Sequence, residues 1–340
     1  LKQIVNQFSK KFGGIILYGS PGTGKTYWAI KFVKNINGNS EFITFHKSYG
    51  YEEFVEGIWP EVENGVVTYV IRDGIFKKLA IEAIYSGMSH NNEENSGESG
   101  GRTSNGEEDV SYRDKKEKVQ ECLKSIVEGG KSECSLRFNN APKYFLIIDE
   151  INRGDLSRIF GELITLLEPD KRLSMSNQVN QVIVRLPYSG ELFAVPPNLY
   201  IIGTMNSTDR SIALVDYALR RRFAFIELSP QPELLEDREV DGLSLKKLLE
   251  RLNKEIGEKL GKDFEIGHSY FLGVNSNEAL HAVWYYQIVP LLREYFYTSS
   301  DELRRIFRSI EELYDPSKAR AVDPGRLVGL LKEWVGGGEG

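Results

Sequence analysis

Short hydrophobic runs and amphipathic segments alternate along the first two thirds of the 340-residue chain. The runs are short and are bounded by glycine, asparagine or charged residues, so they predict buried strands. These strands are expected at residues 13–20, 41–46, 143–150, 199–206 and 223–228. Apolar positions with helical spacing recur at residues 25–36, 75–87, 156–168 and 209–221. Strands that alternate with helices predict an α/β fold, in which helices cover both faces of a parallel sheet.

Other patterns occupy the rest of the chain. Residues 48–58 are expected to form a short helix, and residues 65–74, "GVVTYVIRDG", part of a hairpin. After Pro230 the strand signals fade, while helical spacing continues in three segments. These helices are expected at residues 243–256, 278–296 and 300–314. We therefore expect a large α/β domain over residues 1–229 and a smaller helical domain over residues 230–340.

A polar, glycine-rich and charged stretch interrupts the α/β domain at about residues 87–118. It has too few apolar residues to bury a core of its own, so we expect a flexible insertion. The simplest interpretation is a solvated loop without a separate function.

Composition narrows the possible classes. The chain is 41% hydrophobic and 27% charged, as in ordinary globular proteins. Its net charge of −6 argues against a surface that coats DNA. Cys122 and Cys134 are its two cysteines, which argues against a disulfide scaffold and favours a reducing, cytoplasmic location. No apolar run approaches the roughly 18 residues of a membrane helix. The first residues lack a signal-peptide core and begin at Leu1, so we expect a fragment of a longer protein.

The segment "GSPGTGKT" fits the phosphate-loop pattern G-x-x-x-x-G-K-[ST] and lies between a predicted strand and a predicted helix. Its glycines allow backbone N–H groups to surround phosphate oxygens, and the helix start adds a positive dipole end. We expect Lys25 to reach the β- and γ-phosphates and Thr26 to offer its hydroxyl to Mg²⁺. The predicted nucleotide-binding residues are Gly19, Ser20, Pro21, Gly22, Thr23, Gly24, Lys25 and Thr26.

Two acidic residues, Asp149 and Glu150, end the apolar run "YFLIIDE". Ligands of open α/β sheets bind at the carboxyl ends of strands. We expect Asp149 to hold Mg²⁺, directly or through water, and Glu150 to polarise the water that attacks the γ-phosphate. The alternative is an acidic pair that caps the next helix.

Asn206 ends the next buried run, "LYIIGTMN". Its amide can hydrogen-bond both phosphate and water. Asp209 follows three residues later, where it either helps to hold that water or caps the next helix.

Three adjacent arginines, Arg220, Arg221 and Arg222, have no acidic neighbour in the sequence. Because they repel each other, they need a negative partner from elsewhere: a nucleic acid, a carboxylate or a nucleotide phosphate. A salt-bridged helix end is the alternative without a catalytic role.

The chain resembles the AAA+ nucleoside triphosphatases, and within them the McrB family. The closest resemblance lies in two stretches, "IIDEINRGDLSRIFGELITLLEPDKR" and "MNSTDRSIALVDYALRRRF". Two shorter stretches also resemble that family: "TFHKSYGYEEFVEGI" and "IGHSYF". It covers the chain from Gly13 to about Phe271, apart from the polar insertion. Two departures are Ser20, where proline is frequent, and the long spacing between the two phosphate motifs.

The resemblance implies an AAA+ fold with a helical lid, GTP as the substrate with Mg²⁺, and a hexameric ring that drives an McrC-type endonuclease. DNA would be recognised by an upstream domain absent from this sequence, with possible contacts in the ring pore. The resemblance also implies that an arginine from a neighbouring subunit completes each site. Arg221 and Arg222 are the leading candidates, Arg153 of "DEINR" is another interface arginine, and Arg220 pairs with a carboxylate. His268 of "GHSYF" either senses the nucleotide or is an ordinary buried histidine.

The residues leave other functions open. An ATP-driven chaperone of the MoxR type shares the "DEINR" stretch, and the purine choice rests on resemblance, since residues 253–256, "NKEI", lack the aspartate of an N-K-x-D motif. A nucleotide-gated scaffold with little hydrolysis and a direct DNA-binding module are further alternatives. The chain shows no constellation of nuclease carboxylates and lysine, so any DNA cleavage is expected from a partner.

Overall fold

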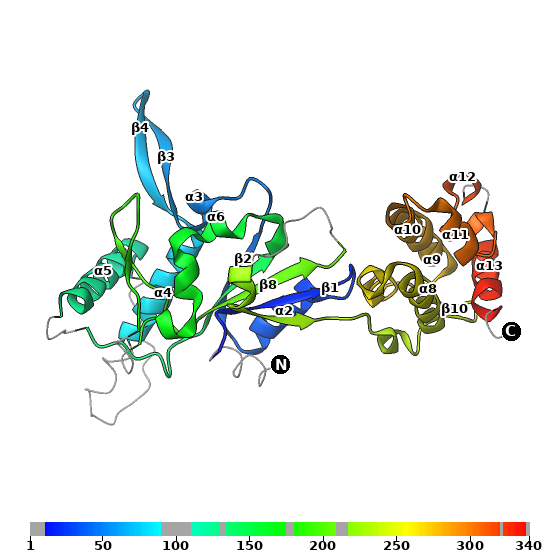
Figure 1. The fold of residues 1–340 in the computed structure, drawn as a ribbon, viewed down its shortest axis with the longest axis horizontal. Helices are drawn as coiled ribbons and strands as arrows, with labels where there is room; N and C mark the ends of the chain where they lie inside the picture. The colour runs from blue at the N-terminus through cyan, green and yellow to red at the C-terminus, as the bar shows by residue number, and fades with distance from the viewer. Residues whose placement is uncertain are drawn as a thin grey trace. The chain divides into compact units, whose positions relative to one another are not determined.

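A five-stranded sheet forms the centre of the N-terminal part of the chain (Figure 1). Its strand order is β2 (Asn39–Thr44), β5 (Tyr144–Asp149), β8 (Leu199–Asn206), β1 (Gly14–Gly19) and β9 (Phe223–Glu227). The pairs β2–β5 and β5–β8 are parallel. All five strands were predicted from the hydrophobic runs, and the α/β class is confirmed.

The structure is a computed structural model that describes residues 11–89, 110–129, 134–174, 180–208, 217–319 and 322–337. The chain forms two compact units. The first contains Leu1–Leu17, Thr26–Met205 and Ser211–Ile226, and the second contains Tyr18–Lys25, Asn206–Arg210 and Glu227–Gly340. The phosphate-loop residues up to Lys25 group with the residues from Glu227 onward, and the division into domains after residue 229 stays a prediction.

The helices of the first unit are α2 (Lys25–Asn35), α3 (Tyr51–Phe54), α4 (Ile75–Ser89), α5 (Tyr112–Glu128), α6 (Leu156–Phe160) and α7 (Tyr217–Arg220). The helix expected over residues 156–168 is interrupted: α6 ends before Gly161, and a 3₁₀ segment, Gly161–Leu167, follows. Gly161 has φ +52°, a left-handed conformation that ends an α-helix. The helix expected over residues 209–221 is described only as α7, because residues 209–216 lie outside the described part of the chain.

The insertion is shorter than expected. Helix α5 begins at Tyr112, so residues 112–118, which were assigned to the flexible stretch, are helical. Ser111 caps the helix by accepting a hydrogen bond from the N–H of Asp114. Val119 and Leu123 are buried against residues of α4, and this packing was hidden by the polar sequence that precedes it. The rest of the expected insertion, residues 90–109, lies outside the described residues.

Cys122 of α5 and Cys134 form a disulfide, with their Cα atoms 5.2 Å apart. The small number of cysteines had argued against a disulfide scaffold, and this single bridge was not predicted. They lie 12 residues apart in the chain, with Cys122 on α5.

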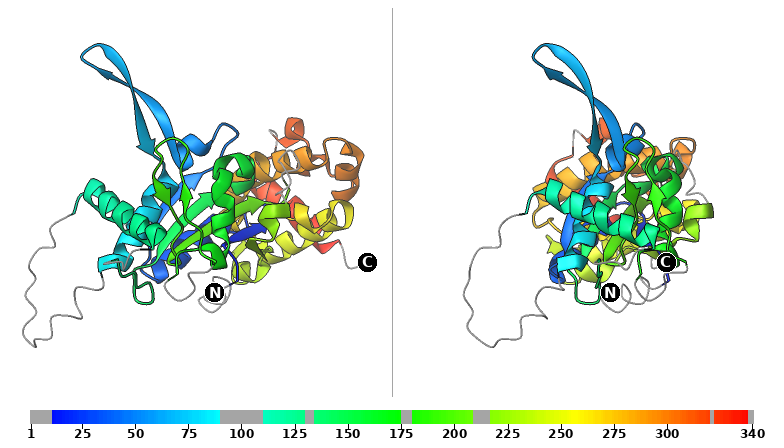
Figure 2. Two further views of the ribbon diagram at one scale, coloured as in Figure 1. Left: turned by 60° about the vertical axis from the view of Figure 1, so that its left-hand side comes forward. Right: turned by 90° about the vertical axis from the view of Figure 1, so that its left-hand side faces the viewer.

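A two-stranded hairpin leaves the first unit between α3 and α4 (Figure 2). It consists of β3 (Glu56–Glu63) and β4 (Val66–Asp73), which pair antiparallel. The turn residues Asn64 and Gly65 have φ values of +52° and +80°, as a two-residue hairpin turn requires. The expected helix over residues 48–58 is wrong beyond Phe54, because Glu56 already belongs to β3. A smaller hairpin joins β6 (Val184–Arg185) and β7 (Leu192–Phe193).

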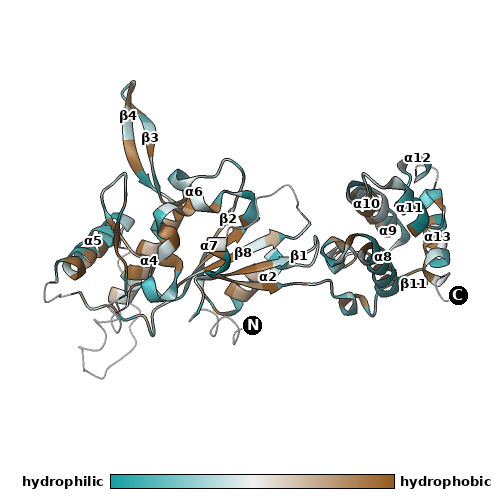
Figure 3. Cartoon of the chain, viewed as in Figure 1, coloured by the Kyte–Doolittle hydropathy of each residue, from teal (hydrophilic) through white to brown (hydrophobic). Residues whose placement is uncertain are grey.

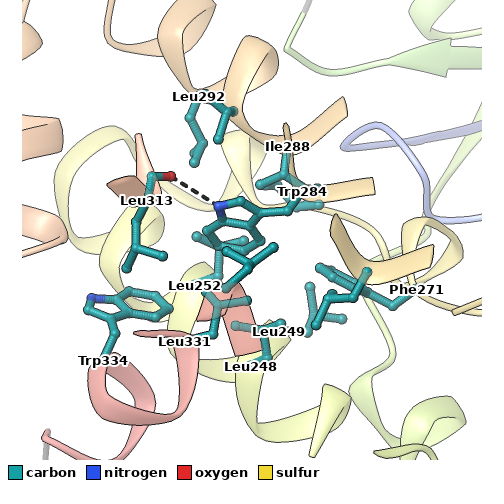
Figure 4. Close-up of a cluster of buried hydrophobic side chains, with 14 of the residues drawn as sticks. Leu248, Leu249, Leu252, Phe271, Trp284, Ile288, Leu292, Leu313, Leu331 and Trp334 are labelled. Atoms are coloured by element: carbon teal, nitrogen blue, oxygen red, sulfur yellow. Dashed lines mark hydrogen bonds between the residues drawn. The ribbon is translucent and has the colours of Figure 1, made fainter. Parts of the chain in front are cut away.

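The C-terminal part of the second unit is helical, as expected. It contains the short pair β10 (Glu239–Val240) and β11 (Leu243–Ser244), followed by α8 (Leu245–Leu260), α9 (Asn277–Val283), α10 (Val289–Tyr295), α11 (Ser300–Ile306), α12 (Pro316–Ala319) and α13 (Pro324–Gly336). Trp284 and Trp334 are fully buried in its core (Figure 4). Their indole N–H groups donate to the carbonyls of Leu313 (3.0 Å) and Ile306 (2.8 Å), so the polar atoms of this core are satisfied. In the described part of the chain, no helix has the length and apolar character needed to cross a membrane.

Candidate functional site

The loop between β1 and α2 has the backbone that its glycines predict. Gly19, Gly22 and Gly24 have positive φ values of 152°, 78° and 82°. The ammonium of Lys25, which is only 7% exposed, donates to the carbonyls of Gly19 (3.1 Å) and Ser20 (2.8 Å). The loop therefore turns around the lysine, and the positive charge is held within the loop.

A C-terminal segment of the second unit grips this loop through its backbone. The N–H of Gly267 donates to the carbonyl of Pro21 (2.8 Å), and the N–H of Ser269 donates to that of Gly22 (3.0 Å). A Cβ atom on Gly267 would overlap the backbone of Gly22, and one on Gly22 would overlap the ring of Tyr270. Of this segment, only His268 was predicted to belong to the site. Gly22 and Gly267 are visible in the sequence as glycines, but only the fold shows that they lie close together.

His268 is buried, and its Nδ1 accepts a hydrogen bond from the N–H of Gln231 (3.1 Å). Burial lowers the pKa of His268. An imidazole whose Nδ1 accepts is neutral and carries its proton on Nε2. His268 is therefore a neutral side chain next to the residues that grip the loop, and its contact with a nucleotide stays a prediction.

Three oxygen-bearing side chains meet at the carboxyl end of β5 in the first unit. The hydroxyls of Thr26 (2.7 Å) and Thr204 (2.5 Å) both donate to Oδ1 of Asp149. Thr26 directly follows Lys25 in the chain, so the residue that ends the phosphate-loop motif touches the acidic residue of the second motif. Hydroxyl and carboxylate oxygens are the ligands that Mg²⁺ prefers. Thr204 was missed, since a threonine inside a buried strand gives no separate signal.

Glu150 has an unusual backbone, with φ +51° in the left-handed region. Its N–H donates to the Thr204 hydroxyl (3.3 Å), and its carboxylate lies 3.3 Å from Nε of Arg153. Arg153 is about half exposed. Glu150 thus leaves the extended backbone of the strand, and its carboxylate forms an ion pair with Arg153.

Asn206 is the last residue of β8 and is half-buried, as expected for a residue at the carboxyl end of a strand. The next N–H, that of Ser207, donates to the carbonyl of Gly19 (2.9 Å), which ties the end of β8 to the start of the phosphate loop. Asp209 lies outside the described residues.

The structure separates the three adjacent arginines. Arg222 is 5% exposed and its guanidinium lies 2.7 Å from the carboxylate of Glu168. Arg221 has a side chain that is 69% exposed and lies 3.7 Å from the same carboxylate. Arg220 lies over the ring of Phe225. Glu168 thus pairs with Arg222 and lies farther from Arg221, while the carboxylate pairing expected of Arg220 stays a prediction. Of the two candidates for a role in a neighbouring subunit, the structure leaves Arg221 accessible.

Comparisons with known proteins agree with this organisation. A family described as "McrB, alpha-helical lid domain" matches residues 244–314, and one described as "AAA domain (dynein-related subfamily)" matches residues 105–223. The chain is 35% identical, over 316 residues, to the Escherichia coli protein "Type IV methyl-directed restriction enzyme EcoKMcrB subunit", a match that covers 83% of this chain and 54% of that protein. It is 27% identical, over 226 residues, to the Bacillus subtilis protein "Type II restriction enzyme BsuMI component YdiS", covering 62% of this chain and 55% of that protein.

The chain spans about half the length of these curated relatives. Its sheet, phosphate loop and acidic pair have the organisation of an AAA domain, and the helical part matches the McrB lid. The chain belongs to the McrB family of AAA+ proteins, of which it contains the AAA domain and the helical lid.

Proposed function

We propose that the chain is the GTP-hydrolysing motor of a modification-dependent restriction system, and that it forms rings and drives a partner endonuclease subunit. The observation that carries hydrolysis is the hydrogen bond from Thr26 to Asp149, which joins the phosphate-loop motif to the acidic motif. The restriction enzymes among its relatives support the biological role. The preference for GTP and the hexameric ring rest on the family resemblance.

The residues present fit a bound Mg²⁺. Thr26 and Asp149 would hold the ion, directly or through water, and the ion would neutralise charge on the phosphates. Both threonine hydroxyls donate to Oδ1 of Asp149, so they would fix the orientation of the carboxylate that holds the ion. Thr204 thus orients a ligand without being one itself.

Each remaining side chain has a distinct task. Lys25 would bind the β- and γ-phosphates from within the loop. Glu150 would orient and polarise the attacking water, and Asn206 would hydrogen-bond that water or the γ-phosphate. Arg221 of a neighbouring subunit would stabilise the charge that develops on the transferred phosphoryl group, since a guanidinium stays charged and offers several donors.

Hydrolysis of GTP and of ATP by the purified chain tests this proposal, with and without Mg²⁺ and with and without an McrC-type endonuclease subunit. We expect Mg²⁺-dependent hydrolysis that strongly prefers GTP and rises when the endonuclease subunit is added. Equal turnover of the two nucleotides would favour the MoxR-type chaperone instead. Nucleotide binding without turnover would favour the scaffold.

A further inference from the structure

Beyond its base, the hairpin β3–β4 has an apolar residue at every position of one face. In the described part of the chain, its two strands pair only with each other. The register places Ile58 opposite Ile71, Pro60 opposite Tyr69 and Val62 opposite Val67. Because side chains alternate between the faces of a strand, these three pairs share one face. We name this set the apolar ribbon face: Ile58, Pro60, Val62, Val67, Tyr69 and Ile71.

Every residue of the apolar ribbon face is exposed to solvent. Val62 is 74% exposed and Tyr69 is 72% exposed. Figure 3 shows hydrophobic residues along both strands of the hairpin. Scattered hydrophobic residues are normal on a surface, but a continuous face of about 500 Å² is at the upper end for a monomer and typically marks a binding site.

The opposite face of the ribbon is mixed, because Trp59, Val66 and Val70 alternate there with charged and hydroxyl side chains. Arg72 pairs with Glu61 across the strands at 2.7 Å, and the Thr68 hydroxyl donates to the carbonyl of Glu61. Trp59 and Val70 lie opposite each other and are partly buried, whereas the residues of the apolar ribbon face are all exposed. Among the described residues, none covers the apolar ribbon face, and an isolated hairpin is only marginally stable.

A buried lysine holds the base of the ribbon. Glu56 and Asp73 lie opposite each other as the first pair of the ladder, and the ammonium of Lys77 on α4 contacts them at 2.7 Å and 2.6 Å. It also contacts Glu191 at 2.6 Å, and its side chain is fully buried. Three carboxylates so close together could bind a metal ion, but the ammonium takes that place. Burial alone would lower the pKa of Lys77, but the hydrogen-bonded carboxylates outweigh it and raise that pKa.

The carboxylates at the base of the ribbon also contact two further elements. Lys116 of α5 contacts Asp73 at 2.7 Å and Glu191 at 2.9 Å. The hydroxyl of Ser189, in the turn between β6 and β7, donates to Glu56 at 2.6 Å. The ribbon is thus fixed at its base to α4, α5 and the β6–β7 hairpin, while its apolar face stays in solvent. This arrangement fits an arm that presents a surface to another molecule.

We propose that the apolar ribbon face is the docking surface for a protein partner that presents an apolar patch, namely the endonuclease subunit of the proposed function. The inference rests on the proposed function for the identity of that subunit. The location and chemistry of the surface come from the ribbon itself.

Charge excludes a nucleic acid as the occupant. The exposed ionisable residues of the ribbon are Glu61, Glu63 and Arg72, and the arginine is already paired. A surface that binds phosphates needs unpaired lysine or arginine side chains. An apolar and slightly acidic ribbon would instead repel a DNA backbone.

A second copy of this chain fits less well. A contact in a ring, where the ribbon of one copy meets a different surface of the next copy, would need a matching apolar surface elsewhere on the chain. Among the described residues, the other large exposed hydrophobic side chains lie one or two to an element: Tyr27, Trp28, Phe42, Val127, Tyr188, Leu234, Tyr286 and Tyr297.

Two neighbouring substitutions test the proposal. Tyr69→Lys places a charge on the apolar ribbon face, and Thr68→Lys places the same charge on the opposite face as the matched control. Tyr69→Thr is a third variant, which removes the ring but keeps a strand-forming residue. Affinity for the purified McrC-type endonuclease subunit is measured by fluorescence anisotropy with GTP and Mg²⁺. Basal hydrolysis and self-association, by analytical ultracentrifugation, are measured in parallel.

We expect Tyr69→Lys to weaken endonuclease binding at least about tenfold, as for an aromatic residue central to an interface, with Tyr69→Thr intermediate and Thr68→Lys unchanged. Basal hydrolysis, self-association and thermal stability should be the same in all of them. Wild-type affinity in Tyr69→Lys overturns the proposal. Loss of self-association in Tyr69→Lys also overturns it, in favour of a second copy.

The proposed function fails separately, if the wild-type chain does not hydrolyse GTP. Should such a chain still bind the endonuclease subunit through Tyr69, the docking surface stands. If the wild-type chain does not bind the endonuclease subunit at all, the docking proposal is overturned.

Discussion

Arg222 and Arg221 are adjacent, yet the structure predicts that replacing Arg222 by alanine lowers stability, whereas replacing Arg221 lowers hydrolysis. Arg222→Ala removes a guanidinium that is 5% exposed and leaves Glu168, whose side chain is 30% exposed, without its closest partner. Breaking a fully buried pair costs roughly 3–5 kcal/mol, whereas an exposed pair contributes roughly 0–1 kcal/mol. Because Glu168 keeps some access to water, we expect a loss of about 2–3 kcal/mol. In a unit of this size, that lowers the melting temperature by about 5–10 °C.

Arg221→Ala should leave the melting temperature unchanged, because the Arg221 side chain is 69% exposed and is 3.7 Å from Glu168. If Arg221 acts on the nucleotide of a neighbouring subunit, its loss should reduce hydrolysis by a factor of about 10³ while nucleotide binding survives. Differential scanning fluorimetry and a phosphate-release assay on the same samples separate the two effects. Glu168→Gln is the matched control, since it should destabilise the chain as Arg222→Ala does.

Mixing of variants tests whether the arginine acts between subunits. An Arg221→Ala subunit keeps an intact phosphate loop, and a Lys25→Ala subunit keeps Arg221. Mixed rings should regain activity wherever Lys25 of one subunit meets Arg221 of the next. Absence of rescue, together with specific activity that does not depend on protein concentration, would refute the interface role of Arg221. A normal melting temperature for Arg222→Ala would refute the structural role of Arg222.

Four further substitutions test the site within one subunit. Lys25→Ala should weaken GTP binding, whereas Glu150→Gln should keep binding and lose hydrolysis; normal turnover in Glu150→Gln would contradict its role as the base. Thr204→Val removes the second hydrogen-bond donor to Asp149. The Mg²⁺ concentration needed for half-maximal hydrolysis should therefore rise about tenfold. An unchanged Mg²⁺ dependence would show that Thr204 does not orient the carboxylate. Gly267→Ala places a methyl group against the backbone of Gly22, so nucleotide affinity measured by calorimetry should fall, and wild-type affinity would mean that the grip on the loop is dispensable.

The strands and the phosphate loop could be predicted because their signals are local. Each strand is a short run of apolar residues, and the loop needs glycines where the backbone adopts positive φ, as at Gly22 and Gly24. The acidic pair could be predicted for the same reason, because Asp149 is the last residue of the buried strand β5 and Glu150 follows it. What remained hidden was the left-handed backbone of Glu150, which no residue preference indicates.

The hairpin β3–β4 illustrates why the pattern of a single segment can mislead. Its second strand was expected from "GVVTYVIRDG", but residues 56–58, which begin its first strand, were expected to be helical. Pro60 and the acidic residues Glu61 and Glu63 obscure the alternation in β3, which becomes clear only in the register with β4. The same register places Glu56 opposite Asp73, an unfavourable pair that Lys77 of α4 neutralises.

The arginines show most directly what the sequence leaves open, because it gives their charge but not their partners. Arg172 is buried, and its guanidinium donates to the carbonyls of nearby Leu167 and of the more distant Gly13 and Leu199. Burial lowers its pKa to about 10, so it remains charged near neutral pH. Arg222 is likewise committed to its own subunit, through Glu168. An arginine next to a nucleotide motif is therefore a candidate for catalysis only when the fold leaves its guanidinium accessible. Among Arg172, Arg221 and Arg222, the accessible one is Arg221.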